Sequence, residues 1–158
     1  MSDQNQNMQT IRSAYEDGIN KGDIDLHADA FAPGYVNHYN GRDLDVEAFK
    51  HIYGEFVAGF PDLNTTIEDI FADGDKVAVR HTYRGTHRAP WMGIPPTGKA
   101  VTVTATDLYH MRDGKIVEEW VEMNLLSLLQ QLGVIPTPGQ PPAPSAPAPG
   151  QGPSPVDG

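Results

Sequence analysis

Two acidic residues, Asp107 and Glu119, lie in strand-like runs on either side of a turn that ends at Gly114. The runs 101–111 and 116–123 are rich in Val, Thr and Ile and alternate in polarity, which predicts a β-hairpin. If both carboxyls lie on its apolar face, burial raises their pKa values and mutual repulsion separates them. Such a pair can exchange protons with a substrate, one carboxyl as the base and the other as the acid.

The geometry of the turn decides which residues of this hairpin face each other. A two-residue Asp-Gly turn would pair Arg112 with Lys115, whereas a three-residue loop with a glycine bulge would pair Met111 with Lys115. The longer loop separates an apolar face from a mostly polar one, and the shorter turn mixes them, so the pattern favours the longer loop. In that register Asp107 lies directly opposite Glu119.

Composition limits the classes of partner. The chain has 158 residues, a net charge of −10 and no cysteine. This length suffices for one domain with a sizeable core. An acidic chain without a basic stripe disfavours nucleic acid, and the lack of Cys excludes disulfides, thiolate metal ligands and cysteine nucleophiles. The polar N-terminal residues and the lack of an apolar run near the roughly 20 residues of a membrane span predict a cytoplasmic protein with no membrane partner.

The period of the apolar residues changes from helical to strand-like along the chain. Helices with strands of one apolar face predict an α+β fold, in which N-terminal helices pack on a curved antiparallel sheet and close a cone-shaped cavity. The expected helices cover 8–19, 23–31, 46–60 and 125–132; the expected strands cover 63–71, 76–85 and the two runs of the hairpin; and 35–40 is read as a connector.

Several side chains should share the cavity with the two carboxyls. The alternation of the strands places His81, Tyr83 and Tyr109 on the same face, and it predicts that Thr65, Ile67 and Phe71 of the preceding strand also face inward. The loop over 86–99 has turn residues at both ends and carries Trp91, as expected of a loop at a site entrance. No His-Glu-x-x-His motif or regular histidine cluster is present, so we expect no metal site.

Two further segments have no obvious place in the cavity. Trp120 should lie on the outer face of the sheet with Glu118, Glu122 and arginines, which fits either a subunit interface or a set of exposed salt bridges. Residues 136–158 contain most of the 14 prolines and cannot bury enough apolar area to fold. We therefore predict one domain over 1–135 and a disordered Pro/Ala/Gly-rich tail over 136–158.

Several short stretches, taken together, resemble the SnoaL-like polyketide cyclase (ester cyclase) family of the nuclear transport factor 2-like superfamily. They are 60–63 (Phe-Pro-Asp-Leu), 85–87 (Gly-Thr-His), 93–99 (Gly-Ile-Pro-Pro-Thr-Gly-Lys), 107–109 (Asp-Leu-Tyr), 113–118 (Asp-Gly-Lys-Ile-Val-Glu), Trp120 and 128–133 (Leu-Leu-Gln-Gln-Leu-Gly). The resemblance implies a cone-shaped α+β barrel and cofactor-free chemistry, in which an intramolecular aldol-type addition closes a ring on a hydrophobic polyketide-like carbonyl compound. Relatives on the same scaffold isomerise ketosteroids, open epoxides or only bind ligands.

The resemblance also exposes a departure. Family cyclases typically use an Asp directly after the position of Trp120, and this chain has Val121 there. We therefore expect Asp107 and Glu119 to be the catalytic residues; the alternative is a non-catalytic member that binds a small ligand. Substrate contacts are expected from His38, His81, Tyr83, His87, Trp91, Tyr109 and Val121. The expected protein needs no cofactor or metal, takes a small hydrophobic ligand, and forms a homodimer or homotetramer.

Overall fold

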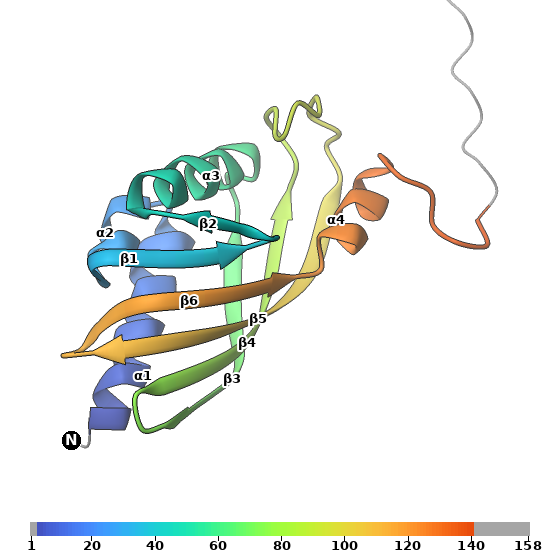
Figure 1. Ribbon diagram of the computed structural model, residues 1–158. Coiled ribbons are helices and arrows are strands. Elements are labelled where there is room, and N and C mark those ends of the chain that lie inside the picture. The colour runs from blue at the N-terminus through green and yellow to red at the C-terminus, as the bar shows by residue number, and fades with distance from the viewer. Residues whose placement is uncertain (1–2, 141–158) are drawn as a thin grey trace, which may run out of the picture.

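The computed structural model describes residues 3–140 and contains a six-stranded sheet that curves around the helices (Figure 1). The strand order is β2-β1-β6-β5-β4-β3; β1 and β6 run parallel, and all other neighbours are antiparallel. The expected α+β fold with helices on a curved sheet is thus confirmed. The elements are α1 (Asp3–Ser13), η1 (Ala14–Gly18), η2 (Ile19–Lys21), α2 (Ile24–Ala28), β1 (Phe31–Tyr39), β2 (Arg42–Leu44), α3 (Val46–Gly59), β3 (Asn64–Asp73), β4 (Lys76–Thr86), β5 (Ala100–Arg112), β6 (Lys115–Met123) and α4 (Leu125–Leu132).

The N-terminal helical segment changes its winding before it ends. The α-helix α1 passes into η1, one π-helical turn, and then into the 3-10 turn η2. The segment stops at Gly22, whose φ of 73° is the left-handed conformation that glycine tolerates best. Single π-helical turns inside helices occur often at functional sites. Here the π-helical turn carries Tyr15, which is buried against the sheet.

The segment predicted as a connector over 35–40 is instead most of strand β1. Tyr35, Asn37 and Tyr39 alternate with more exposed neighbours, which is the period of a strand. The preceding Pro33 and Gly34 interrupt this pattern, and the pairing of β1 with β6 shifts at that point. The predicted second helix is correspondingly shorter, because the chain already enters β1 at its predicted last residue, Phe31.

The predicted register of the β5–β6 hairpin is wrong, although Asp107 and Glu119 both face inward as predicted. Asp113 and Gly114 have φ values of 52° and 72°, and together they form a two-residue turn of the type whose two central residues are both left-handed. A bulge at Val117 then shifts the pairing by a second residue. The two shifts add to one full pleat, so Asp107 lies opposite Val121 and Tyr109 lies opposite Glu119.

The β3–β4 hairpin departs from its predicted pattern in the same way. Its turn also has two residues, and a bulge at Glu68 shifts the pairing further along. Thr65 and Ile67 therefore pair with inner-face residues of β4, as predicted. Phe71, which was predicted to face inward, lies on the outer face and is 65% exposed.

The long loop between β4 and β5 folds back onto the end of α3. Backbone N–H groups of Arg88 and Ala89 donate to the carbonyl oxygen of Gly59 at 2.9 and 3.2 Å. Trp91 packs against Phe56 there and is only 5% exposed. Among residues 3–140, no helix has the length and apolar character needed to cross a membrane.

Two glycines in helical segments should respond oppositely to alanine. A Cβ on Gly18 would lie 2.7 Å from the Cβ of His27 and 2.9 Å from its backbone, whereas a Cβ on Gly54 in α3 would have no atom within 4 Å. We expect Gly18→Ala to destabilise the fold by about 1–3 kcal/mol through overpacking. Gly54→Ala should stabilise it by about 0.5–1 kcal/mol through helix propensity. Urea denaturation measures both, and equal effects would contradict the close approach of η1 to α2.

Candidate functional site

The carboxyl groups of Asp107 and Glu119 lie on the inner face of the sheet, one pleat apart on neighbouring strands. Asp107 is 1% exposed and Glu119 is 2% exposed. An ionised carboxyl is costly in such an interior unless hydrogen bonds or an opposite charge stabilise it. The partners of each carboxyl therefore determine what the pair can do.

Asp107 gathers three hydrogen-bonding groups at a single oxygen. Tyr15 Oη lies 2.6 Å from Asp107 Oδ2, His81 Nε2 lies 2.7 Å from it, and Tyr109 Oη lies 3.2 Å from it. Tyr15 Oη is also 2.5 Å from Tyr109 Oη, so the phenols form a chain that ends on the carboxyl. Each phenol has a single proton, so the chain of phenols delivers a hydrogen bond to Asp107 Oδ2, and His81 Nε2 can donate a further one when its proton is on that nitrogen. Asp107 Oδ1 is buried and has no hydrogen-bond partner among the described residues.

Glu119 is bound from the neighbouring strand β1. Tyr35 Oη donates a hydrogen bond to Glu119 Oε2, and Asn37 Nδ2 donates to the same oxygen at 3.1 Å. Asn37 Nδ2 also lies 3.0 Å from Tyr35 Oη. Tyr109 is the cross-strand partner of Glu119, lowers its pKa, and lies 3.2 Å from Asp107 Oδ2, so it lies between the two carboxyls.

Burial shifts the pKa values of Glu119 and the phenols away from their ordinary values. Loss of solvent, and next the charge of Asp107, raise the pKa of Glu119 from 4.5 to about 8, against the opposing effect of its hydrogen bonds. Burial likewise raises the pKa values of Tyr15, Tyr35 and Tyr109, so the phenols stay neutral. At neutral pH Glu119 is therefore mostly protonated.

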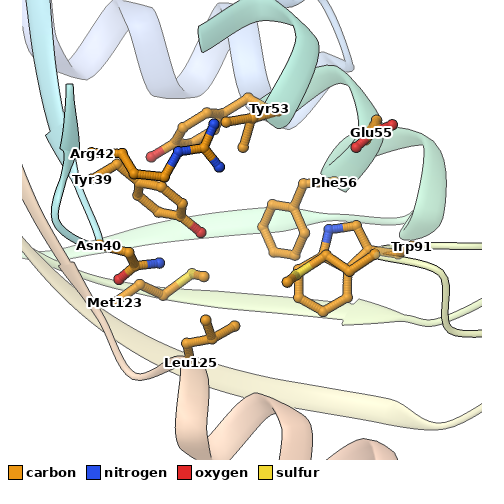
Figure 2. Close-up of a pocket in the computed structure, with 11 residues that line it drawn as sticks. Tyr39, Asn40, Arg42, Tyr53, Glu55, Phe56, Trp91, Met123 and Leu125 are labelled. Carbon is orange, nitrogen blue, oxygen red and sulfur yellow. The ribbon is translucent and has the colours of Figure 1, made fainter. Parts of the chain in front are cut away.

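A cavity of about 330 Å³ opens at the mouth formed by β1, α3 and the β4–β5 loop (Figure 2). Phe56, Trp91, Met123 and Leu125 form an apolar side, and Tyr39 and its turn form a more polar one. This volume lies within the range of small-ligand pockets. Neither carboxyl lines the cavity. Tyr53 connects the two regions, because it lines the cavity and also lies within the electrostatic influence of the carboxyls. Burial is the main cause of its raised pKa, followed by Tyr83 and then by the charges of Glu119 and Asp107.

The structure brings together most of the residues expected to contact substrate, but not all of them. His81, Tyr83, Tyr109 and Val121 are buried on the inner face near the carboxyls. Trp91 reaches the cavity from the loop. His87 is buried behind that loop, stacked on Phe60 and within 3.2 Å of Thr97, and it does not line the cavity.

His38 lies on the opposite, outer face of the sheet, so its expected contact with substrate is not retained. Its Nδ1 is 2.7 Å from Asp43, and its Nε2 is 2.8 Å from Glu118. Its ring stacks on Trp120, with a centroid separation of 5.2 Å. The hydrogen bonds to Glu118 and then Asp43 raise the pKa of His38. These contacts place the His38 ring in the outer-face cluster predicted around Trp120.

Sequence reasoning missed three side chains of the buried network: Tyr15, Tyr35 and Asn37. Tyr15 sat in a helical stripe whose apolar members gave no hint of a hydrogen bond to a distant strand. Tyr35 and Asn37 did carry a signal, since they alternate with Val36 and His38 as strand residues do. Within residues 3–140, no group of three or more His, Cys, Asp or Glu side chains is arranged to hold a metal ion.

Comparison with known proteins assigns the chain to a family. A family model described as SnoaL-like polyketide cyclase matches residues 9–132. The chain belongs to the SnoaL-like polyketide cyclase family. Members of this family share a small-ligand-binding fold, and the apolar cavity at the mouth of the sheet agrees with that. No protein with curated annotation matches the chain.

Solved structures of similar proteins carry more than one functional description. IdmH of Streptomyces antibioticus, a candidate polyketide cyclase, is 36% identical, with a TM-score of 0.71 and coverage of 81% of this chain and 99% of IdmH. AclR of Streptomyces galilaeus, a candidate hydroxylase, is 26% identical, with a TM-score of 0.73 and coverage of 84% and 96%. A candidate SnoaL-like polyketide cyclase of Jannaschia sp. CCS1 is 24% identical, with a TM-score of 0.77 and coverage of 86% and 97%, and supports the fold alone.

The raised pKa of Glu119 should make stability depend on pH. Because this pKa moves from 4.5 to about 8 on folding, the folded protein binds more protons than the unfolded chain between these pH values. The free energy of unfolding should therefore fall as pH rises through this window, by up to about 1.4 kcal/mol per pH unit. Glu119→Gln removes this titration, so urea denaturation from pH 5 to 8 should give a flatter profile.

His38→Gln is the matched control for this measurement. The raised pKa of His38 also makes stability fall with rising pH, but from the outer face. In the His38→Gln background, Glu119→Gln should still flatten the pH dependence of the free energy of unfolding. Parallel profiles for the wild type and Glu119→Gln would contradict the raised pKa of Glu119.

Proposed function

We propose that the protein is a cofactor-free acid/base catalyst that closes a ring on a hydrophobic, polyketide-like carbonyl compound. The observation that carries the proposal is the buried pair itself, a mostly protonated Glu119 one pleat from an Asp107 whose Oδ2 lies within hydrogen-bonding distance of Tyr15, His81 and Tyr109. Family membership and the description of IdmH as a candidate polyketide cyclase point to the same reaction class.

The proposed reaction conserves atoms and protons. The Asp107 carboxylate removes a proton from a carbon between two carbonyl groups, and the resulting enolate carbon attacks a ketone carbon of the same molecule to form the C–C bond. The proton of Glu119 passes to the new alkoxide oxygen as charge develops there. Tyr109 contacts both carboxyls, so it can carry the proton from Asp107 back to Glu119 and restore the starting state.

This assignment accounts for Val121. The usual acid/base position of the family holds a side chain that cannot transfer a proton. Glu119 lies two residues earlier on the same strand and on the same face, and it pairs with Tyr109 across the sheet. The proton donor has therefore moved by one pleat, and the partner strand supplies the base.

A second candidate function is the binding of a small hydrophobic ligand without turnover. The observation in its favour is that neither carboxyl lines the cavity, whose walls are mainly apolar and aromatic. The two candidates differ in whether a bound carbonyl compound exchanges its acidic proton.

Proton exchange on a simple β-keto ester distinguishes these functions. In D₂O the wild type should catalyse exchange of the α-proton of ethyl 2-benzylacetoacetate, followed by proton NMR. Asp107→Asn should slow the catalysed exchange by about 10²-fold or more, the range of a positioned base. Asp17→Asn is the control, since Asp17 is an exposed carboxylate paired with Lys21.

Glu119→Gln completes the test and covers the case in which Asp107→Asn fails to fold. It keeps a neutral hydrogen-bond donor but cannot release a proton, so exchange should continue while the pH dependence near 8 disappears. If both variants retain the wild-type rate and pH profile, acid/base catalysis by this pair is refuted, and ligand binding is the better description.

We also propose that the outer face of the sheet joins two copies of the chain. Phe71, Ala78, Leu108, Trp120 and His38 are successive cross-strand partners, so they form one row across five strands. The large apolar members Phe71 and Leu108 are 65% and 41% exposed. An apolar row flanked by charges of both signs can pair with its own symmetry copy.

Leu108→Lys should convert such an oligomer to a monomer, because it places a charge in the centre of the row. Light scattering after size-exclusion chromatography measures the mass. Leu26→Lys is the matched control, since Leu26 is 43% exposed on α2, away from the outer face. A wild-type protein that is already monomeric, or equal masses for all three proteins, would contradict this interface.

A further inference from the structure

The cavity at the mouth of the sheet has two chemically different sides. Its apolar side comes from α3, the β4–β5 loop and the start of α4 (Figure 2). The opposite side comes from a single turn between β1 and β2, which contributes the phenol of Tyr39, the amide of Asn40 and the guanidinium of Arg42. A ligand that fills this cavity therefore meets apolar walls at one end and a cation at the other.

The register of β1 and β2 directs Arg42 toward the cavity. Asn40 and Gly41 have φ values of 49° and 75°, so they form a tight two-residue turn, and Tyr39 pairs with Arg42 across it. Directly paired residues share one face of a sheet. Two residues further on, Leu44 is 2% exposed on this same face. Arg42 is thus an inner-face residue at the open rim and not a residue of the outer face.

Arg42 has no anionic partner among residues 3–140. Its neighbour Asp43 points the other way and contacts His38 at 2.7 Å. Glu55 is the only other charged residue of the described cavity lining, and its carboxyl lies 3.7 Å from His51, one turn away on α3. A cation on the inner face of an acidic protein, without an ion pair and beside a ligand-sized cavity, is in the setting of a binding group.

We propose that the ligand of this cavity carries a carboxylate, which Arg42 binds while the ligand's apolar body lies against Phe56 and Trp91. The planar guanidinium can donate two parallel hydrogen bonds to a carboxylate, and Tyr39 and Asn40 offer additional donors beside it. The inference deepens the proposed function. It depends on this cavity as the ligand site, but not on acid/base catalysis by the two carboxyls. It narrows the ligand class, because it predicts a free acid as substrate or ligand.

A matched pair of ligands tests this inference without turnover. Isothermal titration calorimetry should show that 2-naphthoate binds the full-length protein at least about tenfold more tightly than the neutral 2-naphthamide. Arg42→Gln should weaken 2-naphthoate binding by about tenfold and leave 2-naphthamide binding unchanged. Arg42→Lys should recover part of the preference, since it keeps the charge but loses the fork of donors. Shifts of the Trp91 indole NMR signal place the ligand in this cavity.

Arg112→Gln is the control for a general loss of positive charge, since Arg112 is exposed beside the β5–β6 turn, outside the cavity lining. Equal affinities for the two ligands, no binding of either, or an equal loss of both in Arg42→Gln would overturn the inference. An Arg42-dependent preference in a protein that exchanges no proton would refute only the catalytic proposal. Proton exchange without a carboxylate preference would refute only the role of Arg42.

Discussion

The placement of two carboxyl groups in one desolvated interior is the constraint on which the rest of this structure depends. Two buried carboxylates one pleat apart repel each other, and neither is hydrated, so one of them retains a proton. The fold meets this constraint with donors from several elements, which include Tyr15 from η1, Tyr35 and Asn37 from β1, and His81 from β4. Each donor is itself buried, so the network specifies how helices and sheet fit together as well as where a proton resides.

Local irregularities position this network. The bulge at Val117 restores Glu119 to the inner face after the tight turn has displaced it, and the π-helical turn η1 carries the Tyr15 hydroxyl that reaches Asp107. A regular strand or a regular helix would place these side chains differently, because each residue of shift turns a strand over and rotates a helix by about a quarter turn. Irregular backbone is common near functional sites for this reason.

The chain keeps the scaffold of its family while redistributing its polar groups. Val121 follows Trp120 on β6 and pairs with Asp107 across the sheet, and Glu119 lies one pleat earlier on β6. The ligand cavity lies nearer the mouth. Tyr53 lines this cavity, and the charges of Glu119 and Asp107 contribute to its raised pKa. The cavity at the rim and the carboxyl pair in the interior are thus separate regions of the same fold, so ligand binding and proton transfer can vary independently on it.

The sequence by itself determined the α+β class, the order of most elements, and the inner face of β4, β5 and most of β6, because apolar periodicity records burial directly. It therefore identified Asp107 and Glu119 as inner-face residues. The tertiary structure decided which residues oppose them, because pairing depends on turn type and on bulges, and a compensating pair of shifts leaves the face pattern unchanged. It also decided that Tyr15 and Tyr35 complete the network and that His38 lies outside it, since contacts between residues distant in sequence leave no local periodic signal.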